Sequence, residues 1–361
     1  MKIVIATDSF KGSLSATQVV DILGSYLSNR YMDATIVGLP LADGGEGLVE
    51  CLSAALPSRI LSCSVQGPLG QPVQTQLMLC GDMAVVEMAQ AAGLPLLSKP
   101  DALNSTTYGV GEMIAFAEQQ GAKRILLGLG GSATNDMGCG MAAALGCRFW
   151  DGNRYFVPTG GTLGDIKRIE PAAPHDIVAL CDVKNPLYGP QGAAYVFGRQ
   201  KGADDSQIEQ LDSGLRHVAN LLADMGIVGF DGEGTGAAGG LGAGVIAFLG
   251  GRLSRGIDMV LDTLHFAQTV QDADLVITGE GRLDSQSLQG KVIDGVIARC
   301  RCPVVAVVGQ MQLPDYHRWG LEAVFDTARH QQSADYRAEA RTTLLAAAED
   351  LAHWIDANIK A

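Results

Sequence analysis

Charged and hydroxyl-bearing residues gather directly after five apolar runs of this chain. The runs are short, rich in valine and isoleucine and without polar alternation, which is typical of strands buried on both faces. Because open α/β sheets bind ligands at the carboxyl ends of their strands, we expect these residues to line a site. They are Asp8, Ser9, Lys11 and Ser13; Asp43 and Glu46; Ser132, Thr134, Asn135 and Asp136; Asp182 and Asn185; and Glu280, Arg282, Asp284, Ser285, Gln286 and Lys291.

Each of these groups also has a purely structural interpretation. Ser, Thr, Asn and Asp after a strand are the preferred N-caps of the following helix, and glycine makes the turn between the two. For any single loop a cap is the preferred interpretation. Five such strand ends in one chain favour a ligand site instead.

The segment GLGGSATND, residues 128–136, is the most glycine-rich of these strand ends. A glycine-rich turn from strand to helix exposes backbone N–H groups at a helix N-terminus, where anions bind. Gly130 and Gly131 supply the turn, and the side chains of Ser132, Thr134 and Asn135 can donate further hydrogen bonds. The segment therefore predicts a site for a phosphate or a carboxylate.

Two other nucleotide-binding patterns are weak. The segment SQSLQGKV, residues 285–292, has Ser285 in place of the first glycine of a P-loop and Val292 after the lysine. GTGAAG, residues 234–239, satisfies G-x-G-x-x-G, but it follows no convincing strand and has no suitable acidic residue about 20 positions later.

Phosphoryl transfer is the chemistry that these residue types favour. It needs glycine-rich loops for phosphates, carboxylates for Mg²⁺, a cation near the transferred group and a carboxylate that accepts an alcohol proton. Lys11, Lys201, Arg282 and Lys291 are the candidate cations. The six histidines are scattered and no G-x-S-x-G motif occurs, which disfavours a zinc site and a Ser-His-Asp triad. A kinase for a small molecule is the leading hypothesis.

Composition limits the partners and the compartment. A net charge of −13 disfavours nucleic acid and anionic membranes as partners, because binding to them depends on basic surface. No apolar stretch reaches the roughly 20 residues that span a bilayer. The eight cysteines follow neither a zinc nor a disulfide spacing, so we expect buried thiols in a reducing cytoplasm.

The apolar runs alternate with helical segments, which predicts an α/β chain with mostly parallel strands. Between about residues 60 and 80 the pattern changes to short strands joined by Gly-Pro turns, which indicates an antiparallel meander. We therefore predict a Rossmann-like parallel sheet domain, residues 1–60 with 260–361, that carries an inserted α/β domain with a mixed sheet, residues 61–259. The C-terminal run from Arg337 predicts an amphipathic helix with a structural role only.

The strand-end segments, in order over about residues 1–330, resemble the signatures of the bacterial type I glycerate kinases. The matching segments are DSFKGSLSA, LADGGEG, GLGGSATND, CDVKNPL, QKGA, GAAGGLGAG, SRGIDMVLD and TGEGRLDSQSLQGK. The chain departs from the usual pattern at Thr7 and Arg199, where proline is usual, at Met137, where glycine is usual, and at Glu233 and Thr235, where small residues are typical.

The resemblance implies an ATP- and Mg²⁺-dependent transfer to D-glycerate, mainly at the 2-hydroxyl, that gives 2-phosphoglycerate and ADP. It also implies a Rossmann-like domain with an inserted α/β domain and an active site in the cleft between them. The expected partners are the small molecules glycerate and ATP, and the expected assembly is a monomer or a small homo-oligomer.

Roles can be suggested for individual residues. Asp182 is the first candidate to accept the glycerate hydroxyl proton or, with Asp284, to bind Mg²⁺. Lys11 and Arg282 are assigned to the glycerate carboxylate and the migrating phosphoryl group. The expected substrate-binding residues are Asp8, Ser9, Asp43, Glu46 and Asn185. The expected nucleotide- and phosphate-binding residues are Gly130, Gly131, Ser132, Thr134, Asn135, Asp136, Gly279, Glu280 and Lys291.

Two alternatives stay open at this point. GLGGSA is similar to the phosphate loop GLGSSA of the galactokinase and homoserine kinase class, so the acceptor could be another small hydroxy acid or sugar acid. A nucleotide-binding regulator without turnover is the alternative outside the kinases.

Overall fold

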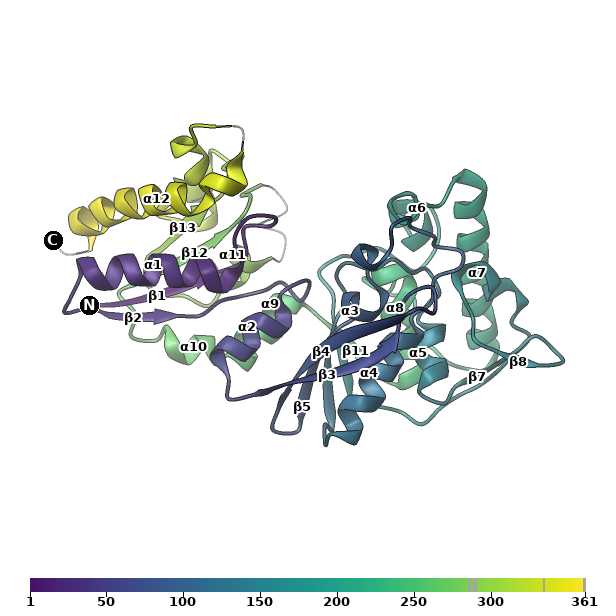
Figure 1. Ribbon diagram of the computed structural model, residues 1–361. Helices are drawn as coiled ribbons and strands as arrows, with labels where there is room; N and C mark the ends of the chain where they lie inside the picture. Colours follow the sequence, from purple (N-terminus) through teal and green to yellow (C-terminus); the bar gives the residue numbers. More distant parts are fainter. Residues whose placement is uncertain (285–286, 288–290, 334, 360–361) are drawn as a thin grey trace. The chain divides into compact units, whose positions relative to one another are not determined.

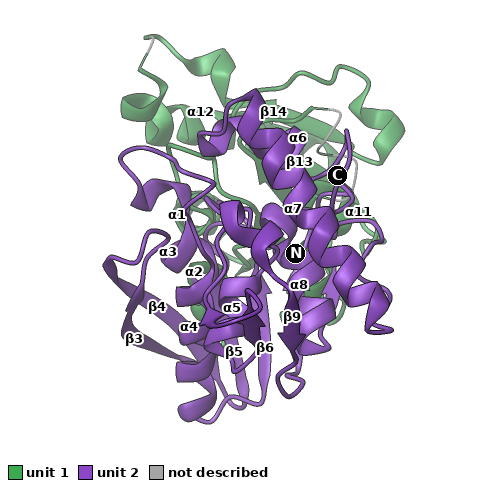
Figure 2. Cartoon of the chain, turned by 90° about the vertical axis from the view of Figure 1, so that its right-hand side faces the viewer, with its two compact units in different colours: residues 1–43, 50–56, 255–361 green, residues 44–49, 57–254 purple. Residues whose placement is uncertain are grey.

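The computed structural model describes residues 1–284, 287, 291–333 and 335–359. The chain forms two compact units (Figure 2). The first unit comprises residues 1–43, 50–56 and 255–361, and the second comprises residues 44–49 and 57–254. These bounds differ from the division expected from the sequence chiefly at residues 44–49. That segment belongs to the second unit because it packs there: the N–H of Val49 donates to the Glu87 carboxylate at 3.0 Å.

The first unit is built on a five-stranded sheet in which every neighbouring pair is parallel. Its strands, in spatial order, are β14 (Ala323–Asp326), β13 (Val304–Val308), β12 (Leu275–Glu280), β1 (Lys2–Thr7) and β2 (Thr35–Gly38). Read from β2, the order in the chain is 2-1-3-4-5, which is a doubly wound sheet. The direction of winding reverses between β1 and β12.

Helices cover both faces of this sheet (Figure 1). α1 (Ala16–Arg30) and α12 (Tyr336–Asn358) contact each other on one face, where Leu23, Leu27, Leu344 and Leu351 are fully buried. α1 begins with a capping box in which Ser15 and Gln18 exchange side-chain and backbone hydrogen bonds. The remaining elements assigned to this unit, wholly or in part, are α2 (Leu48–Ala55), α9 (Gly256–Thr263), α10 (Phe266–Thr269), α11 (Val292–Ile297), η4 (Tyr316–Trp319) and η5 (Thr327–His330).

The second unit contains a mixed six-stranded sheet. In spatial order its strands are β11 (Arg252–Ser254), β10 (Ile177–Leu180), β6 (Arg124–Gly128), β5 (Met83–Glu87), β4 (Pro72–Cys80) and β3 (Arg59–Gln66). β3, β4 and β5 are antiparallel neighbours, whereas β5, β6, β10 and β11 run parallel. The meander expected near residues 60–80 is therefore confirmed, as is the α/β class of the whole chain.

A small antiparallel sheet accompanies it, in the order β8 (Tyr155–Phe156), β7 (Arg148–Trp150) and β9 (Arg168–Glu170). The helices of the second unit are α3 (Ala89–Ala92), α4 (Tyr108–Gln119), α5 (Cys139–Ala144), α6 (Ala193–Phe197), α7 (Asp205–Asp224) and α8 (Ala237–Leu249), with the short turns η1 (Leu94–Leu96), η2 (Gly160–Asp165) and η3 (Arg199–Lys201). Within the described residues, no helix combines the length and the hydropathy that crossing a membrane requires.

Candidate active site

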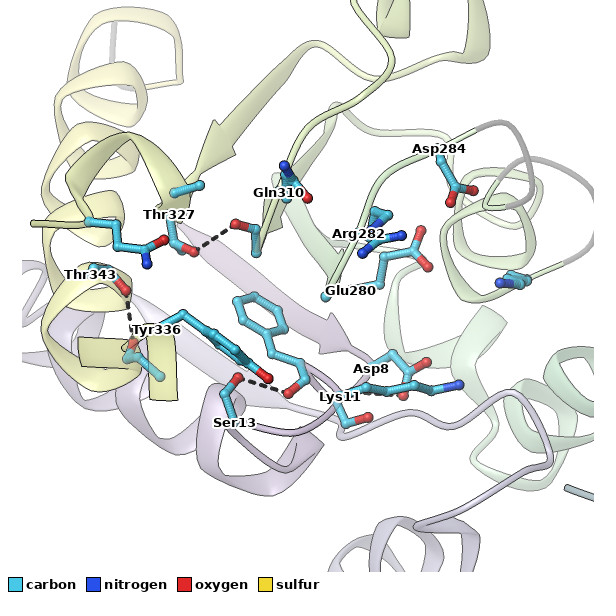
Figure 3. A pocket seen from close by; sticks show the side chains of 18 of the residues that line it. Asp8, Lys11, Ser13, Glu280, Arg282, Asp284, Gln310, Thr327, Tyr336 and Thr343 are labelled. Atoms are coloured by element: carbon cyan, nitrogen blue, oxygen red, sulfur yellow. Dashed lines mark hydrogen bonds between the residues drawn. The ribbon is translucent and has the colours of Figure 1, made fainter. Parts of the chain in front are cut away.

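A pocket of about 660 Å³ opens at the carboxyl ends of β1 and β12 (Figure 3). This is the point where the winding of the sheet reverses, and doubly wound sheets bind ligands there. All the described residues that line the pocket belong to the first unit. The residues expected from the sequence that line it are Asp8, Ser9, Lys11, Ser13, Asp43, Glu280, Arg282, Asp284 and Lys291.

Three strand ends are held together by close backbone contacts beneath this pocket. The N–H of Asp8 donates to the Gly279 carbonyl at 2.9 Å, and the N–H of Gly309 donates to the Glu280 carbonyl at 3.1 Å. A Cβ at Gly309 would lie 2.4 Å from the Gly281 carbonyl oxygen, a distance that real Cβ atoms essentially never show. The close approach of the loops after β12 and β13 therefore requires glycine at position 309.

The loop after β12 is fixed by a buried serine. Ser287 Oγ accepts the N–H of Asp284 at 3.0 Å and donates to the Arg282 carbonyl at 3.1 Å. The N–H of Ser287 in turn donates to the Asp284 carbonyl at 3.1 Å. This turn positions the backbone from which Arg282 and Asp284 reach the pocket. Ser285 and Gln286, also singled out in the sequence, lie outside the described residues.

Two carboxyl groups in the pocket have strongly altered acidity. Burial, with a smaller contribution from Asp43, raises the pKa of Asp8 to about 7. Burial likewise raises the pKa of Glu280 to about 7. Glu280 is 7% exposed, and its Oε1 has no hydrogen-bond partner among the described residues. Both groups can therefore change protonation near neutral pH, which is typical of residues in functional sites.

Three basic side chains line the same pocket as these carboxyl groups. Lys11 Nζ lies 3.9 Å from a carboxylate oxygen of Asp43, and Arg282 and Lys291 line the same pocket. In Figure 3, Asp8, Lys11, Glu280 and Arg282 lie at one end of it. The arrangement can hold an anion and exchange a proton in one place.

Part of the pocket wall was not foreseen from the sequence. Gln310 follows the apolar run PVVAVVG, so the strand-end rule could have found it. Further residues of this wall come from η5, from the position just after it, and from the start of α12, the helix that was given a structural role only. They are Thr327, Ala328, Gln331, Tyr336, Ala340 and Thr343.

In the second unit, the glycine-rich segment after β6 uses its aspartate inside the fold. The Asp136 carboxylate accepts hydrogen bonds from the N–H groups of Thr107, Gly138 and Gly140 at 2.8, 3.1 and 3.2 Å. The Thr107 hydroxyl also donates to it, at 2.8 Å. Burial raises the pKa of Asp136 above its ordinary value, and these hydrogen bonds offset only part of the rise. Its role here is structural: the N-cap of α5 is Gly138, and the Asp136 carboxylate accepts the N–H of Gly140 in the first turn of that helix.

Lys201 lies beneath the same segment. Its ammonium donates to the Thr134 carbonyl at 2.7 Å and to Ser132 Oγ at 3.3 Å, and burial lowers its pKa to about 7. Asn135 is fully buried, and among the described residues neither polar atom of its side chain has a partner. A phosphate-binding role for Gly130, Gly131 and this segment stays a prediction.

The remaining residues expected from the sequence do not line the pocket of the first unit. Asp182 is half-buried after β10, Asn185 donates from Nδ2 to the Gln191 carbonyl at 2.8 Å, and Glu46 is exposed. All three belong to the second unit. Gly279 lies inside β12, where a Cβ would approach the Val307 carbonyl oxygen to 2.1 Å. The roles suggested for these residues stay predictions.

Comparisons with known proteins agree with one another. The model of the glycerate kinase family matches residues 3–356. The glycerate kinase of Bacillus cereus is 44% identical over 347 residues, and the match covers 90% of each chain. The glycerate 2-kinase of Escherichia coli is 42% identical over 342 residues, again with 90% of each chain covered. The crystal structure of a Salmonella typhimurium protein assigned as glycerate kinase 2 superposes with a TM-score of 0.88, at 40% identity and over 100% of both chains.

Proposed function

The chain belongs to the glycerate kinase family, and from this premise we propose that it transfers the terminal phosphoryl group of ATP to the 2-hydroxyl of D-glycerate, with Mg²⁺. Membership of the family makes it an enzyme that phosphorylates glycerate. The nucleotide, the metal and the choice of hydroxyl are the proposed part. The name of the Escherichia coli relative, glycerate 2-kinase, supports the 2-hydroxyl.

One observation carries the proposal: the pocket at the β1–β12 switch point combines two buried carboxyl groups of raised pKa with three cations. Phosphoryl transfer depends mainly on positioning and on electrostatic stabilisation of the charge on the moving group. Lys11 and Arg282 supply positive charge for the glycerate carboxylate and the migrating phosphoryl group. Lys291, which lines the same pocket, is assigned to the nucleotide phosphates.

We place Asp8 before Asp182 as the acceptor of the hydroxyl proton. An ideal general base has a pKa near the operating pH, and the pKa of Asp8 is raised to about 7. Asp8 also lines the same pocket as Lys11 and Arg282. In the proposed step Asp8 takes the hydroxyl proton, the glycerate oxygen bonds to the γ-phosphorus, and the bond from that phosphorus to the bridging oxygen of ADP breaks.

Glu280 has a different proposed task in the same pocket. A carboxyl group that is protonated near neutral pH can donate a hydrogen bond, which a carboxylate cannot. Its Oε1 is buried and has no partner among the described residues, so it has capacity for a ligand atom. We assign the protonated Glu280 to a phosphate oxygen.

The pocket residues fit Mg²⁺ bound together with a nucleotide. Mg²⁺ usually takes one or two carboxylates plus substrate phosphates, and Asp284 lines the pocket as such a donor. The described residues contain no group of three or more His, Cys, Asp or Glu side chains that could form a metal cage. When bound, the ion would neutralise charge on the β- and γ-phosphate oxygens. Asp284, with Asp182 as the second candidate, is proposed to hold it.

The position of the phosphoryl group on the product tests this proposal. The purified chain would be incubated with ATP, Mg²⁺ and D-glycerate, and the products would be followed by ³¹P NMR. A phosphate signal coupled to a single proton, on carbon 2, is expected. A signal coupled to two protons, on carbon 3, would contradict the proposed 2-hydroxyl acceptor.

A further inference from the structure

The pocket of the first unit has two chemically different ends. The charged end comes from the loops after β1 and β12. The other end comes from the loop after β13, from η5 and the residue after it, and from the start of α12. None of the described residues that line it is charged: Gln310, Thr327, Ala328, Gln331, Tyr336, Ala340 and Thr343. In Figure 3, Thr327, Thr343 and Tyr336 lie on the opposite side of the pocket from Arg282 and Asp284.

The size of the pocket exceeds what the acceptor needs. A volume of about 660 Å³ lies within the roughly 300–1,000 Å³ typical of sites for drug-sized ligands. Glycerate is a three-carbon acid and would occupy a small part of this space at the charged end. The uncharged end therefore has room for a second and larger group.

The side chains at the uncharged end are suited to a heterocyclic base. The Thr343 hydroxyl donates to the carbonyls of Glu339 and Ala340 at 3.1 and 3.2 Å, and the Thr327 hydroxyl donates to the Gly309 carbonyl at 3.2 Å. With their protons directed into the backbone, both hydroxyl oxygens are left as acceptors for an amino group. Tyr336 is 48% exposed and adds an aromatic ring at this end, with the Arg337 guanidinium 5.7 Å from the ring centre. A base can stack on such a ring.

We propose that this end, formed by η5 and the first two turns of α12, binds the nucleoside part of a nucleoside triphosphate whose phosphates reach Lys291 and Arg282. The assignment rests on the proposed kinase function, because that function requires a nucleotide. It gives α12 a place in substrate binding. The base lies against Tyr336, and Ala340 is small because a larger side chain would enter the space of the nucleoside.

A pair of substitutions on the same helix tests the assignment. Ala340 is 8% exposed and lines the pocket, whereas Ala338 is exposed and does not line it. Ala340→Leu, Ala338→Leu and wild type would be titrated calorimetrically with ATP and, separately, with inorganic tripolyphosphate, both without glycerate. Leucine is a good helix former, so neither substitution opposes the helix.

We expect Ala340→Leu to weaken ATP binding at least tenfold, which corresponds to about 1.4 kcal/mol. Tripolyphosphate binding should stay within twofold of wild type, because that probe needs only the charged end. Ala338→Leu should match wild type with both probes. Tyr336→Ala is the second variant and should weaken ATP several-fold, again without changing tripolyphosphate binding.

Three results would overturn the assignment. They are unchanged ATP affinity in both Ala340→Leu and Tyr336→Ala, equal losses for ATP and tripolyphosphate, and no ATP binding by the wild type. Failure of the proposed function has a different signature. In that case the selective loss of ATP binding would persist, but the wild type would release no ADP when glycerate is added.

Discussion

At the level of single residues, Asp8 and Glu280 are central to the proposed chemistry of the pocket. They lie at the carboxyl ends of the neighbouring strands β1 and β12. Burial raises the pKa of both carboxyl groups, and the charge of Asp8 adds to the rise at Glu280. The sequence could identify both residues, since each directly follows or ends an apolar run. It could not predict their acidity, because a pKa depends on burial by residues distant in the chain, such as Asp43 beside Asp8.

Asp8→Asn should lower kcat about 10²–10⁴-fold and leave the fold intact, because an amide cannot accept the hydroxyl proton. Asp182→Asn would be assayed in parallel under saturating ATP and glycerate, with circular dichroism as the test of folding. If Asp8→Asn keeps activity within a few-fold of wild type while Asp182→Asn loses orders of magnitude, the base is Asp182, as the sequence first indicated.

Activity should rise with pH through about 7. A general base acts only when deprotonated, and the kcat/KM profile reports the pKa values of the free enzyme. We therefore expect an acidic limb with a midpoint near 7 when kcat/KM for glycerate is measured between pH 5 and pH 9. A limb centred near pH 4, the ordinary value of a carboxyl group, would contradict the role of Asp8.

Stability should change with pH in the opposite direction. The folded pKa values of Asp8 and Glu280 lie above those of the unfolded chain, so the folded state binds more protons between about pH 4 and pH 7. Their contribution is complete below pH 4 and is lost as the pH rises through 7. Urea unfolding at pH 5 and pH 8 should show wild type losing several kcal/mol, at most about 5, more than an Asp8→Asn, Glu280→Gln double variant. Equal losses would show that neither group is shifted.

At the scale of elements, apolar runs predicted the strands well. Each of the five apolar runs that precede the expected site residues forms one: β1, β2, β6, β10 and β12. The run PVVAVVG likewise forms β13. The order of the strands, and hence the switch point, could not be predicted from those runs. The wall formed by α12 was missed for a related reason. Tyr336, Ala340 and Thr343 are ordinary helix residues, and only the packing of α12 against the sheet brings them to the pocket.

The glycine-rich segment 128–136 shows the limit of a local pattern. Its sequence predicts a turn whose N–H groups bind an anion, yet the Asp136 carboxylate itself accepts the N–H groups of Gly138 and Gly140, just after the segment. The segment also packs against residues 238–240 of α8, which have left-handed backbone. Met137 also has a positive φ, of 54°. This conformation favours glycine, which agrees with glycine being usual at that position in the family that the sequence resembles.

Gly239→Ala should destabilise the second unit by at least about 2 kcal/mol. The residue has φ of +70°, and an added Cβ would lie 2.0 Å from the Thr134 carbonyl oxygen. Gly232→Ala is the matched control, because a Cβ there meets nothing within 4 Å and its φ is ordinary. Thermal unfolding of the two variants would compare them. Equal melting temperatures would show that the 134–136 segment is not packed against Gly239.

For the whole molecule, the sequence showed two different patterns of strands, and two domains were predicted from them. Runs of buried parallel strands predicted the sheet of the first unit, and the Gly-Pro turns near residue 70 predicted the antiparallel part of the second. The bounds were harder to place. Residues 44–49 belong to the second unit because of individual contacts, such as the hydrogen bond between Val49 and Glu87. The composition of the sequence does not reveal such contacts.

The central claim is that the whole chain is a kinase whose acceptor is D-glycerate, and the release of ADP tests it most directly. ADP would be followed in a coupled assay with ATP and Mg²⁺, without an acceptor, with D-glycerate, and with other small hydroxy acids and sugar acids. We expect ADP release to depend on an acceptor and to be fastest with D-glycerate. ADP release that does not depend on glycerate, no turnover at all, or a strong preference for another acid would contradict it.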